Sequence, residues 1–251
     1  MLFFRSLLFN VVFVLNNITW FIVALPLLLL PRKTFFLKVL HPWCWSSLWL
    51  HSWICGVRME FRGRENIPQG ACIAASKHQS VWETLALAAS FAEPRYILKK
   101  ELMFVPLFGF YLMRTGQVPI NRGNKADAIA AVNKAAALAM QQGGQLLIFP
   151  EGTRRPVDAR PNYKMGVAHL YEALNVPVVP VAINAGVVWP RRTFIKYPGV
   201  IVMEYLPAIP PGLPKPEFFA LLEKTIEEAT NRLVAEARAH PDFRKAGGPQ
   251  A

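Results

Sequence analysis

Hydrophobic positions divide the chain into an apolar beginning and a longer part in which short apolar runs alternate with amphipathic stretches. Residues 6–30 form one apolar run, which as a helix is long enough to match a hydrocarbon core of about 30 Å. Asparagines and a threonine interrupt this run, and Pro26 breaks the helical hydrogen-bond ladder near its end. The pattern predicts a helix that either crosses a membrane or lies tilted within it. A cleaved signal peptide is the alternative, which the length of the run disfavours.

A second apolar segment, residues 34–57, carries a stripe of tryptophans. Trp45, Trp49 and Trp53 are four positions apart, which places them along one face of a helix. Such a stripe is typical of the boundary between lipid headgroups and acyl chains, so we interpret the segment as an interfacial helix. The alternative is that the three indoles fill a protein core.

Positive charges around these two segments predict their orientation. Arg32, Lys33 and Lys38 in and after the link outnumber Arg5 ahead of it, which by the positive-inside tendency places the link in the cytoplasm. Two complete crossings would then put the remaining chain on the opposite side of the membrane. A first helix that spans or dips, followed by an interfacial helix, keeps residues 58–251 cytoplasmic.

The remainder of the chain reads as alternating strands and helices. We expect strands at residues 71–75, 117–120, 145–149, 178–184 and 200–206, and helices at residues 81–91, 126–141, 165–174 and 217–239. This alternation predicts an α/β fold with a mixed, largely parallel sheet flanked by helices. The expected organisation is a membrane-associated helical pair in residues 1–57 and an α/β domain in residues 58–251.

Composition and charge limit the classes of molecule that the protein is expected to bind. With 53% hydrophobic and 18% charged residues, the 251-residue chain is not a disordered protein. The net charge of +12 is divided into +5 before Glu60 and +7 from there on, so both parts are basic. Nucleic acid, anionic lipid and phosphorylated small molecules all remain open on charge alone, and the apolar beginning favours lipid. Three cysteines do not form a disulfide framework, which agrees with a cytoplasmic location for the α/β part.

Residues 77–83, with the sequence KHQSVWE, stand where a predicted strand ends and a helix begins. His78 and Glu83 are five positions apart, and on one continuous helix they would point about 140° away from each other. Ser80 followed by Glu83 is a capping-box pattern that starts the helix at Ser80 and leaves His78 in the turn. The histidine and the carboxylate are therefore expected to meet.

This pair has the composition of a general base with its orienting acid. A neutral imidazole accepts a proton from an attacking hydroxyl, and a carboxylate sets its tautomer and stabilises the imidazolium that forms. The chain has no G-x-S-x-G elbow, so the hydroxyl is expected to belong to a substrate. The alternative is that Glu83 only caps the helix and His78 is an ordinary turn residue.

Residues 149–155, with the sequence FPEGTRR, also follow a predicted buried strand. Ligands of α/β sheets gather at the carboxyl ends of strands, glycine permits close backbone approach, and a guanidinium holds phosphate in fork geometry. A solvated charged turn is the alternative. Arg122, at the end of the strand expected at 117–120, and the lysines Lys99 and Lys100 are further cationic candidates, although a plain surface role is open for either lysine.

Taken in order, four segments carry a resemblance to a known family. They are His78-x4-Glu83, Gly116-x3-Ile120-x-Arg122, Phe149-Pro150-Glu151-Gly152-Thr153-Arg154 and Val178-Val179-Pro180-Val181. This order resembles the four motifs of glycerolipid acyltransferases, specifically the bacterial 1-acyl-sn-glycerol-3-phosphate acyltransferases. The resemblance implies a catalytic base at His78 oriented by Glu83, and a binding site for the glycerol phosphate formed by Lys100, Arg122, Glu151, Gly152, Thr153 and Arg154.

The resemblance also implies an activity and a setting. The expected reaction transfers a fatty acyl group from acyl-CoA or acyl-carrier protein to the sn-2 hydroxyl of 1-acyl-sn-glycerol 3-phosphate (lysophosphatidate), giving phosphatidate without an acyl-enzyme, metal or bound cofactor. The expected location is the bacterial inner (cytoplasmic) membrane, with the catalytic domain on the cytoplasmic side, anionic lipids as partners and no nucleic acid. The usual first motif ends in Asp, and Glu83 is one methylene longer, so the geometry of this pair is the point at which the chain departs from the family.

Two rival functions stay open at this level. One is an acyltransferase of the same fold with another acceptor, such as glycerol 3-phosphate or a lyso-ornithine lipid. The other is a non-catalytic membrane protein that binds anionic lipids, against which the positioned histidine and glutamate count.

Overall fold

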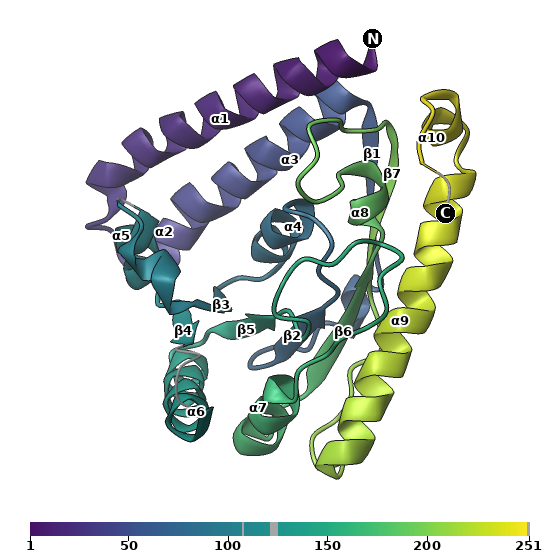
Figure 1. The fold of residues 1–251 in the computed structure, drawn as a ribbon. Coiled ribbons are helices and arrows are strands. Elements are labelled where there is room, and N and C mark those ends of the chain that lie inside the picture. Colours follow the sequence, from purple (N-terminus) through teal and green to yellow (C-terminus); the bar gives the residue numbers. More distant parts are fainter. Residues whose placement is uncertain (107, 121–124, 250–251) are drawn as a thin grey trace.

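The computed structural model of the chain describes residues 1–106, 108–120 and 125–249, with the backbone alone for residues 125–128. Its centre is a seven-stranded sheet with the strand order β1-β7-β6-β2-β5-β3-β4 (Figure 1). The strands are β1 (Val57–Arg62), β2 (Ile73–Ser76), β3 (Pro94–Lys99), β4 (Val118–Ile120), β5 (Gln145–Ile148), β6 (Val178–Ile183) and β7 (Gly199–Tyr205). Neighbouring strands are parallel except for the antiparallel pair β6 and β7, so the prediction of a mixed, largely parallel sheet is confirmed.

The central strand β2 pairs with β5 on one side and β6 on the other. Ile73 lies opposite Leu146 of β5 and opposite Val178 of β6, so the three strands run in step. Because all three are parallel, their carboxyl ends reach the same edge of the sheet. The polar segments that follow β2 and β5 are therefore brought together at this edge.

Helices cover both faces of the sheet. One face packs on α1 (Leu2–Leu27), α3 (His41–Cys55) and α4 (Trp82–Ser90), and the other on α6 (Lys125–Gln141), α7 (Gly166–Leu174) and α9 (Lys215–Ala239). The shorter helical elements are α2 (Arg32–Phe35), the π-helix η1 (Phe36–Leu40), η2 (Arg64–Asn66), η3 (Lys100–Phe104), α5 (Phe108–Thr115), α8 (Ala185–Val188) and α10 (Pro241–Lys245). This is the three-layer arrangement expected of an α/β fold.

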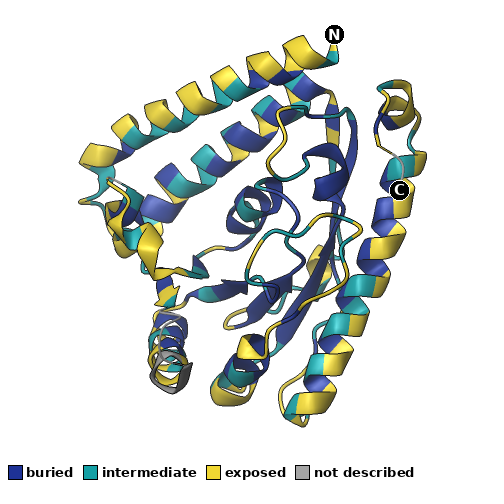
Figure 2. Cartoon of the chain, viewed as in Figure 1, coloured by how far each residue is buried: buried dark blue, intermediate teal, exposed yellow. Residues whose placement is uncertain are grey.

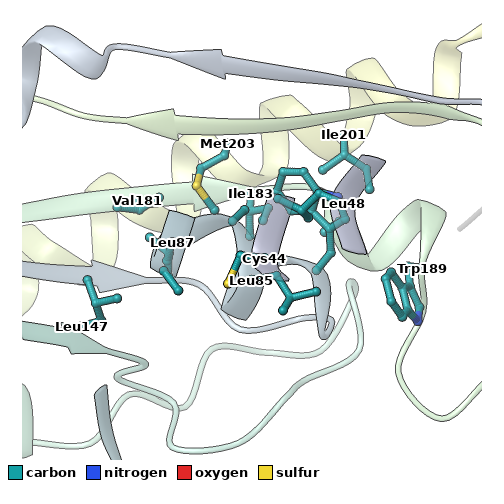
Figure 3. Close-up of a cluster of buried hydrophobic side chains, with 14 of the residues drawn as sticks. Cys44, Leu48, Leu85, Leu87, Leu147, Val181, Ile183, Trp189, Ile201 and Met203 are labelled. Atoms are coloured by element: carbon teal, nitrogen blue, oxygen red, sulfur yellow. The ribbon is translucent and has the colours of Figure 1, made fainter. Parts of the chain in front are cut away.

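The two cores follow from the alternation of side chains along each strand. In β2, Ala74 belongs to the core beneath α3 and α4, whereas Ile73 and Ala75 belong to the core beneath α6, α7 and α9. Figure 3 shows part of the first core, where Cys44 and Leu48 of α3 lie among residues of α4 and the sheet. Burial of one such aliphatic side chain stabilises the fold by about 1.5–3 kcal/mol.

Helices α1 and α3 lie side by side along one face of the molecule (Figure 1). Helix α1 is long and apolar enough to cross a membrane, with a mean hydropathy of 2.0 and only 11% of the most apolar window buried. Two of the asparagines that interrupt its sequence face α3: the Trp43 indole donates to Asn17 Oδ1 at 3.0 Å, and the Asn16 amide donates to Ser47 Oγ at 3.0 Å. Asn16 and Asn17 therefore join the two helices, while the opposite face of α1 stays apolar and exposed (Figure 2).

The tryptophan stripe of α3 is on the outside of the molecule. Trp45, Trp49 and Trp53 are 37%, 53% and 71% exposed, so the alternative that they fill a protein core is wrong. The other face of α3 is buried through Cys44, Leu48 and Cys55 in the core of the sheet. The expected division of the chain after residue 57 falls just after the first residue of β1, and α3 shares its core with the sheet.

Most predicted elements are present with boundaries shifted by two residues or fewer, but β1, β3, α5, α8 and α10 are not among the predicted elements. In β1, Val57, Met59 and Phe61 alternate with charged residues, which is the period of a strand and was a readable signal. Strand β3 begins at Pro94, which the first position of a strand tolerates.

Candidate active site

His78 lies in the turn between β2 and α4, as the capping pattern predicts. Its Nδ1 is 2.9 Å from Glu83 Oε1. The same carboxylate oxygen accepts hydrogen bonds from the backbone N–H groups of Gln79 at 2.7 Å and Ser80 at 2.6 Å. One carboxylate therefore both caps the turn and contacts the imidazole, so the alternative that Glu83 only caps the helix is wrong.

The start of α4 differs slightly from the prediction. The helix begins at Trp82, and the Ser80 hydroxyl accepts from the Trp82 N–H at 3.3 Å instead of lying in a full capping box. The reciprocal half of the box, from the Ser80 N–H to the Glu83 carboxylate, is formed. From the first turn of α4 the Glu83 side chain reaches back to the turn that holds the ring.

The environment of the pair sets the tautomer of the imidazole. The Glu83 side chain is fully buried and acts as an acceptor, so His78 Nδ1 carries the proton in the neutral ring. This leaves Nε2 as the unprotonated nitrogen, on a side chain that is 15% exposed and lines a cavity. The arrangement is that of a base whose reactive nitrogen is free to receive a proton.

The ring of His78 is also held by stacking, which the sequence did not reveal. It lies on the ring of Phe149 with a centroid separation of 3.8 Å and an interplanar angle of 13°. Phe149 stacks in turn near Tyr96 of β3, at 5.9 Å and 16°. Phe149 follows β5 directly, so the register of β5 beside β2 positions this stack.

A buried charge network lies behind the turn. The Lys77 ammonium, 1% exposed, is 3.1 Å from Glu151 Oε1 and 2.7 Å from Glu227 Oε1 of α9. The Tyr163 hydroxyl donates to the same Glu227 oxygen at 2.8 Å. Lys77 and Glu227 are separated by 150 positions in the chain, so no local pattern indicates this contact.

Glu151 has a different environment from that expected of a phosphate-binding residue. Its second carboxylate oxygen accepts from the His78 backbone N–H at 3.3 Å, while the first contacts Lys77. Burial raises the pKa of the Glu151 carboxyl, and the nearby Lys77 ammonium opposes that rise. The carboxylate therefore joins the segment after β5 to the turn after β2.

A cavity of about 810 Å³ opens beside His78. Its polar end is lined by His78, Lys99, Glu151, Gly152, Thr153, Arg154 and Lys164. Its remaining wall is mostly apolar and comes from α1, η1, α3, α4 and α5, including Phe21, Val39, Leu85 and Leu112. One continuous space thus joins a cationic, hydrogen-bonding end to an apolar arm.

The other predicted binding residues divide into three cases. Gly152, Thr153 and Arg154 line the cavity, and Gly152 has a φ of +66°, which favours glycine at this turn. Lys100 is exposed and is not among the cavity-lining residues, whereas the neighbouring Lys99 is. Arg122 lies outside the described residues. Among the residues that the structure describes, no three His, Cys, Asp or Glu side chains gather in a group that can hold a metal ion.

Comparisons with known proteins agree on one family. A sequence profile of the Acyltransferase family matches residues 58–184, which contain both polar segments of the site. The 1-acyl-sn-glycerol-3-phosphate acyltransferase of Pseudomonas aeruginosa is 35% identical over 224 residues, covering 89% of this chain and 86% of the relative. The enzyme of the same name from Limnanthes alba is 27% identical over 158 residues, covering 62% of this chain and 56% of that protein.

A solved structure shares the fold. The crystal structure of the 1-acyl-sn-glycerophosphate acyltransferase PlsC from Thermotoga maritima superposes with a TM-score of 0.78 at 21% sequence identity. The match covers 94% of this chain and 98% of the other, so it includes the N-terminal helices as well as the sheet.

Proposed function

This chain belongs to the acyltransferase family, and from that premise we propose that it transfers a fatty acyl group from a thioester to the sn-2 hydroxyl of 1-acyl-sn-glycerol 3-phosphate, giving phosphatidate. The observation that carries the proposal is the position of the His78–Glu83 pair. His78 lines the same cavity as the cationic residues after β5 and the apolar residues of the N-terminal helices. A lysophospholipid has this same division, with a phosphate at one end, a hydroxyl beside it and an acyl chain beyond.

In the proposed mechanism, His78 acts as the general base. Its Nε2 removes the proton from the sn-2 hydroxyl as that oxygen attacks the thioester carbonyl, and Glu83 stabilises the imidazolium. When the tetrahedral intermediate collapses, the carbon–sulfur bond breaks and the imidazolium returns the proton to the leaving sulfur. The products are phosphatidate and a free thiol, and the reaction needs no acyl-enzyme.

The phosphate of the acceptor is assigned to the segment after β5. Arg154 lines the cavity and supplies a guanidinium with fork geometry, while Thr153 adds a hydroxyl. Lys99 takes the place that the sequence suggested for Lys100, and Arg122 stays part of the proposed site. Glu151 is proposed to position His78 through its backbone N–H, since a carboxylate paired with Lys77 does not attract an anion.

The membrane setting follows from the location of the apolar arm. Residues of α1 and α3 line it, and the outer faces of these helices expose apolar and indole side chains. We place these faces in the cytoplasmic leaflet of a bacterial inner membrane, with the sheet on the cytoplasmic side. Anionic lipids attract the basic chain by about 1 kcal/mol per nearby Lys or Arg.

The decisive experiment measures thiol release from acyl-CoA by the full chain, with and without lysophosphatidate. Wild-type protein should release thiol only with the acceptor, and His78→Ala should lower turnover by about 10²- to 10⁴-fold because the base is lost. His169→Ala, which removes an imidazole from α7 away from the cavity lining, serves as the matched control. Near-normal acyl transfer by His78→Ala would refute the mechanism.

A panel of acceptors tests the substrate. Glycerol 3-phosphate and a lyso-ornithine lipid, supplied in place of lysophosphatidate, should be poor acceptors, because the first lacks an acyl chain for the apolar arm and the second lacks the phosphate. Preferential transfer to either one would overturn the assignment of lysophosphatidate. A complete absence of thioester consumption would favour a protein that only binds anionic lipids.

A further inference from the structure

A second cavity is lined by Arg155, which follows Arg154 of the first cavity in the chain. It has a volume of about 260 Å³, and its polar lining includes Gln79 and the guanidinium groups of Arg155, Arg191 and Arg238. We call it the arginine cavity. Its size is below that of a site for a whole drug-sized ligand, so it suits one end of a larger molecule.

Positive charge predominates in the arginine cavity. Asp158 is the single acidic residue among the described lining residues, and its carboxylate pairs with Arg238 at 2.6 Å. Arg155 Nη2 donates to the Arg160 carbonyl at 3.0 Å, and Arg191 donates to the Arg154 carbonyl. These single contacts hold the three side chains but leave most of their five N–H donors for another acceptor.

The strongest sign of a missing acceptor is a buried amide. Gln79 is 1% exposed, and its Oε1 accepts from the Gly186 N–H at 3.0 Å, while its Nε2 has no partner among the described residues. Arg155 Nε and Arg238 Nε are also buried without a partner there. A buried donor left without an acceptor costs about 1–3 kcal/mol, so these groups together indicate an anionic ligand rich in acceptor oxygens.

The arginine cavity is directly joined to the catalytic turn. Gln79 follows His78 in the chain, and the Arg155 N–H donates to the His78 carbonyl at 2.8 Å. Arg154 and Arg155 are adjacent, with the first lining the larger cavity and the second lining the smaller. A ligand bound in the arginine cavity therefore lies beside the residues that hold the base and the acceptor phosphate.

We infer that the arginine cavity binds a phosphate group of the acyl donor. This inference rests on the proposed acyl transfer, and it adds a site for the donor apart from the acceptor site at Arg154. A thioester donor carries its phosphates on a long flexible arm, so a phosphate anchored within reach of the base lets that arm carry the thioester carbonyl to it. Guanidinium groups bind such oxygens in paired hydrogen bonds. Acyl-CoA and acyl-carrier protein share this chemistry, because both present phosphopantetheine.

The principal test compares Arg238→Gln with Arg232→Gln in the full chain. Both arginines lie on α9 and form ion pairs, but only Arg238 lines the arginine cavity. Arg238→Gln should weaken CoA binding, measured by titration calorimetry, and raise the KM for acyl-CoA by about 10- to 100-fold, the range for loss of one or two charge-assisted hydrogen bonds. It should leave kcat and the KM for lysophosphatidate unchanged. Equal effects of both variants, or no effect on CoA binding, would overturn the inference.

Asp158→Asn separates ligand binding from structural support. It breaks the same ion pair as Arg238→Gln but keeps the guanidinium in the cavity. If the cavity binds phosphate, Asp158→Asn should retain or strengthen CoA binding, because one negative charge is removed. If Arg238 only holds Asp158, the two variants should raise the KM equally, and the inference fails.

The source of the phosphate is distinguished by the probe. CoA, dephospho-CoA, phosphopantetheine and inorganic phosphate are titrated separately into wild-type protein and Arg238→Gln. Binding of phosphopantetheine that depends on Arg238 assigns the group common to both donors, whereas dependence on CoA but not dephospho-CoA assigns the 3′-phosphate. Dependence with inorganic phosphate alone would indicate a free anion site and overturn the assignment to the donor.

The outcomes also separate this inference from the proposed function. CoA binding that requires Arg238, in a protein that transfers no acyl group, would support the cavity and refute acyl transfer. Acyl transfer by a protein whose CoA binding does not depend on Arg238 would support the proposed function and refute the inference about the arginine cavity.

Discussion

The outer face of α1 and α3 and the turn at His78 depart from the usual distribution of residues in opposite ways. On the helices, large apolar side chains are exposed, with Phe4 at 72% and Trp53 at 71%. At the turn, charged side chains are buried, with Lys77 at 1% and Glu83 at 0%. Globular proteins rarely tolerate either feature without a reason.

The two departures are compensated differently. Each buried charge at the turn has partners within the fold, such as Glu83 for His78 and Lys77 for Glu151. The exposed apolar side chains of α1 and α3 are instead stabilised by an apolar environment that removes them from water. This transfer contributes about 25 cal/mol per Å² of apolar area. Thus the polar region is stabilised by the fold itself, whereas the apolar region indicates a membrane.

The largest expected effect comes from removing the acid at the turn. Glu83→Ala should lower kcat by about 10²- to 10⁴-fold, because the imidazole loses the group that sets its tautomer and stabilises its charged form. Glu83→Asp should retain part of the activity. The measurement is thiol release at saturating substrates, and activity of Glu83→Ala equal to that of Glu83→Asp would show that the carboxylate has no part in the reaction.

A smaller effect, on stability, is expected from the network behind the turn. Lys77→Met should lower the free energy of unfolding by about 3–5 kcal/mol, because two carboxylates then lie buried without their cation. Lys77→Met combined with Glu227→Gln should recover part of the loss. Denaturant unfolding in detergent measures both, and a double variant less stable than the single one would contradict this account.

The exposed stripe should affect membrane binding and not folding. Trp49→Ser with Trp53→Ser should weaken binding to anionic vesicles about tenfold or more, because two indoles leave the headgroup boundary. Leu221→Ser removes an exposed apolar side chain from α9 and is the control. Sedimentation with vesicles measures the binding of each variant. An equal loss of binding in the double tryptophan variant and in Leu221→Ser would show that the tryptophan stripe has no special part in membrane binding.

The last expected effect concerns a buried cation beside α1. The Lys196 backbone N–H donates to Ser6 Oγ of α1 at 3.0 Å, and burial lowers the pKa of the Lys196 ammonium to about 8 from its ordinary value of 10.5. Above pH 8 the unfolded chain therefore holds more protons than the folded one, so stability should rise as the pH increases toward 10.5, by at most about 1.4 kcal/mol per pH unit.

Comparing wild type with Lys196→Met removes the contributions of the other titrating groups, because both proteins share them. The difference in the free energy of unfolding between wild type and Lys196→Met, followed by denaturant unfolding from pH 7 to pH 10, should change in favour of the wild type. Parallel curves would show that Lys196 keeps its ordinary pKa.

Local patterns in the sequence determined most of the secondary structure of this protein and the contact at its catalytic turn. Apolar runs located β2, β5, β6 and β7, the spacing of tryptophans marked one face of α3, and Ser80 with Glu83 placed His78 in a turn beside a carboxylate. These features depend on residues a few positions apart, whose relative directions follow from the geometry of a helix, a strand or a cap.

Only the tertiary structure decided which distant side chains meet. The ring of Phe149 lies on His78 because β5 pairs in register with β2, and Glu227 reaches Lys77 because α9 packs across the same sheet. The choice of Lys99 over Lys100 in the cavity lining likewise depends on where β3 ends. Contacts of this kind are set by strand order, register and helix packing, which involve the whole chain at once and leave no mark in any short segment.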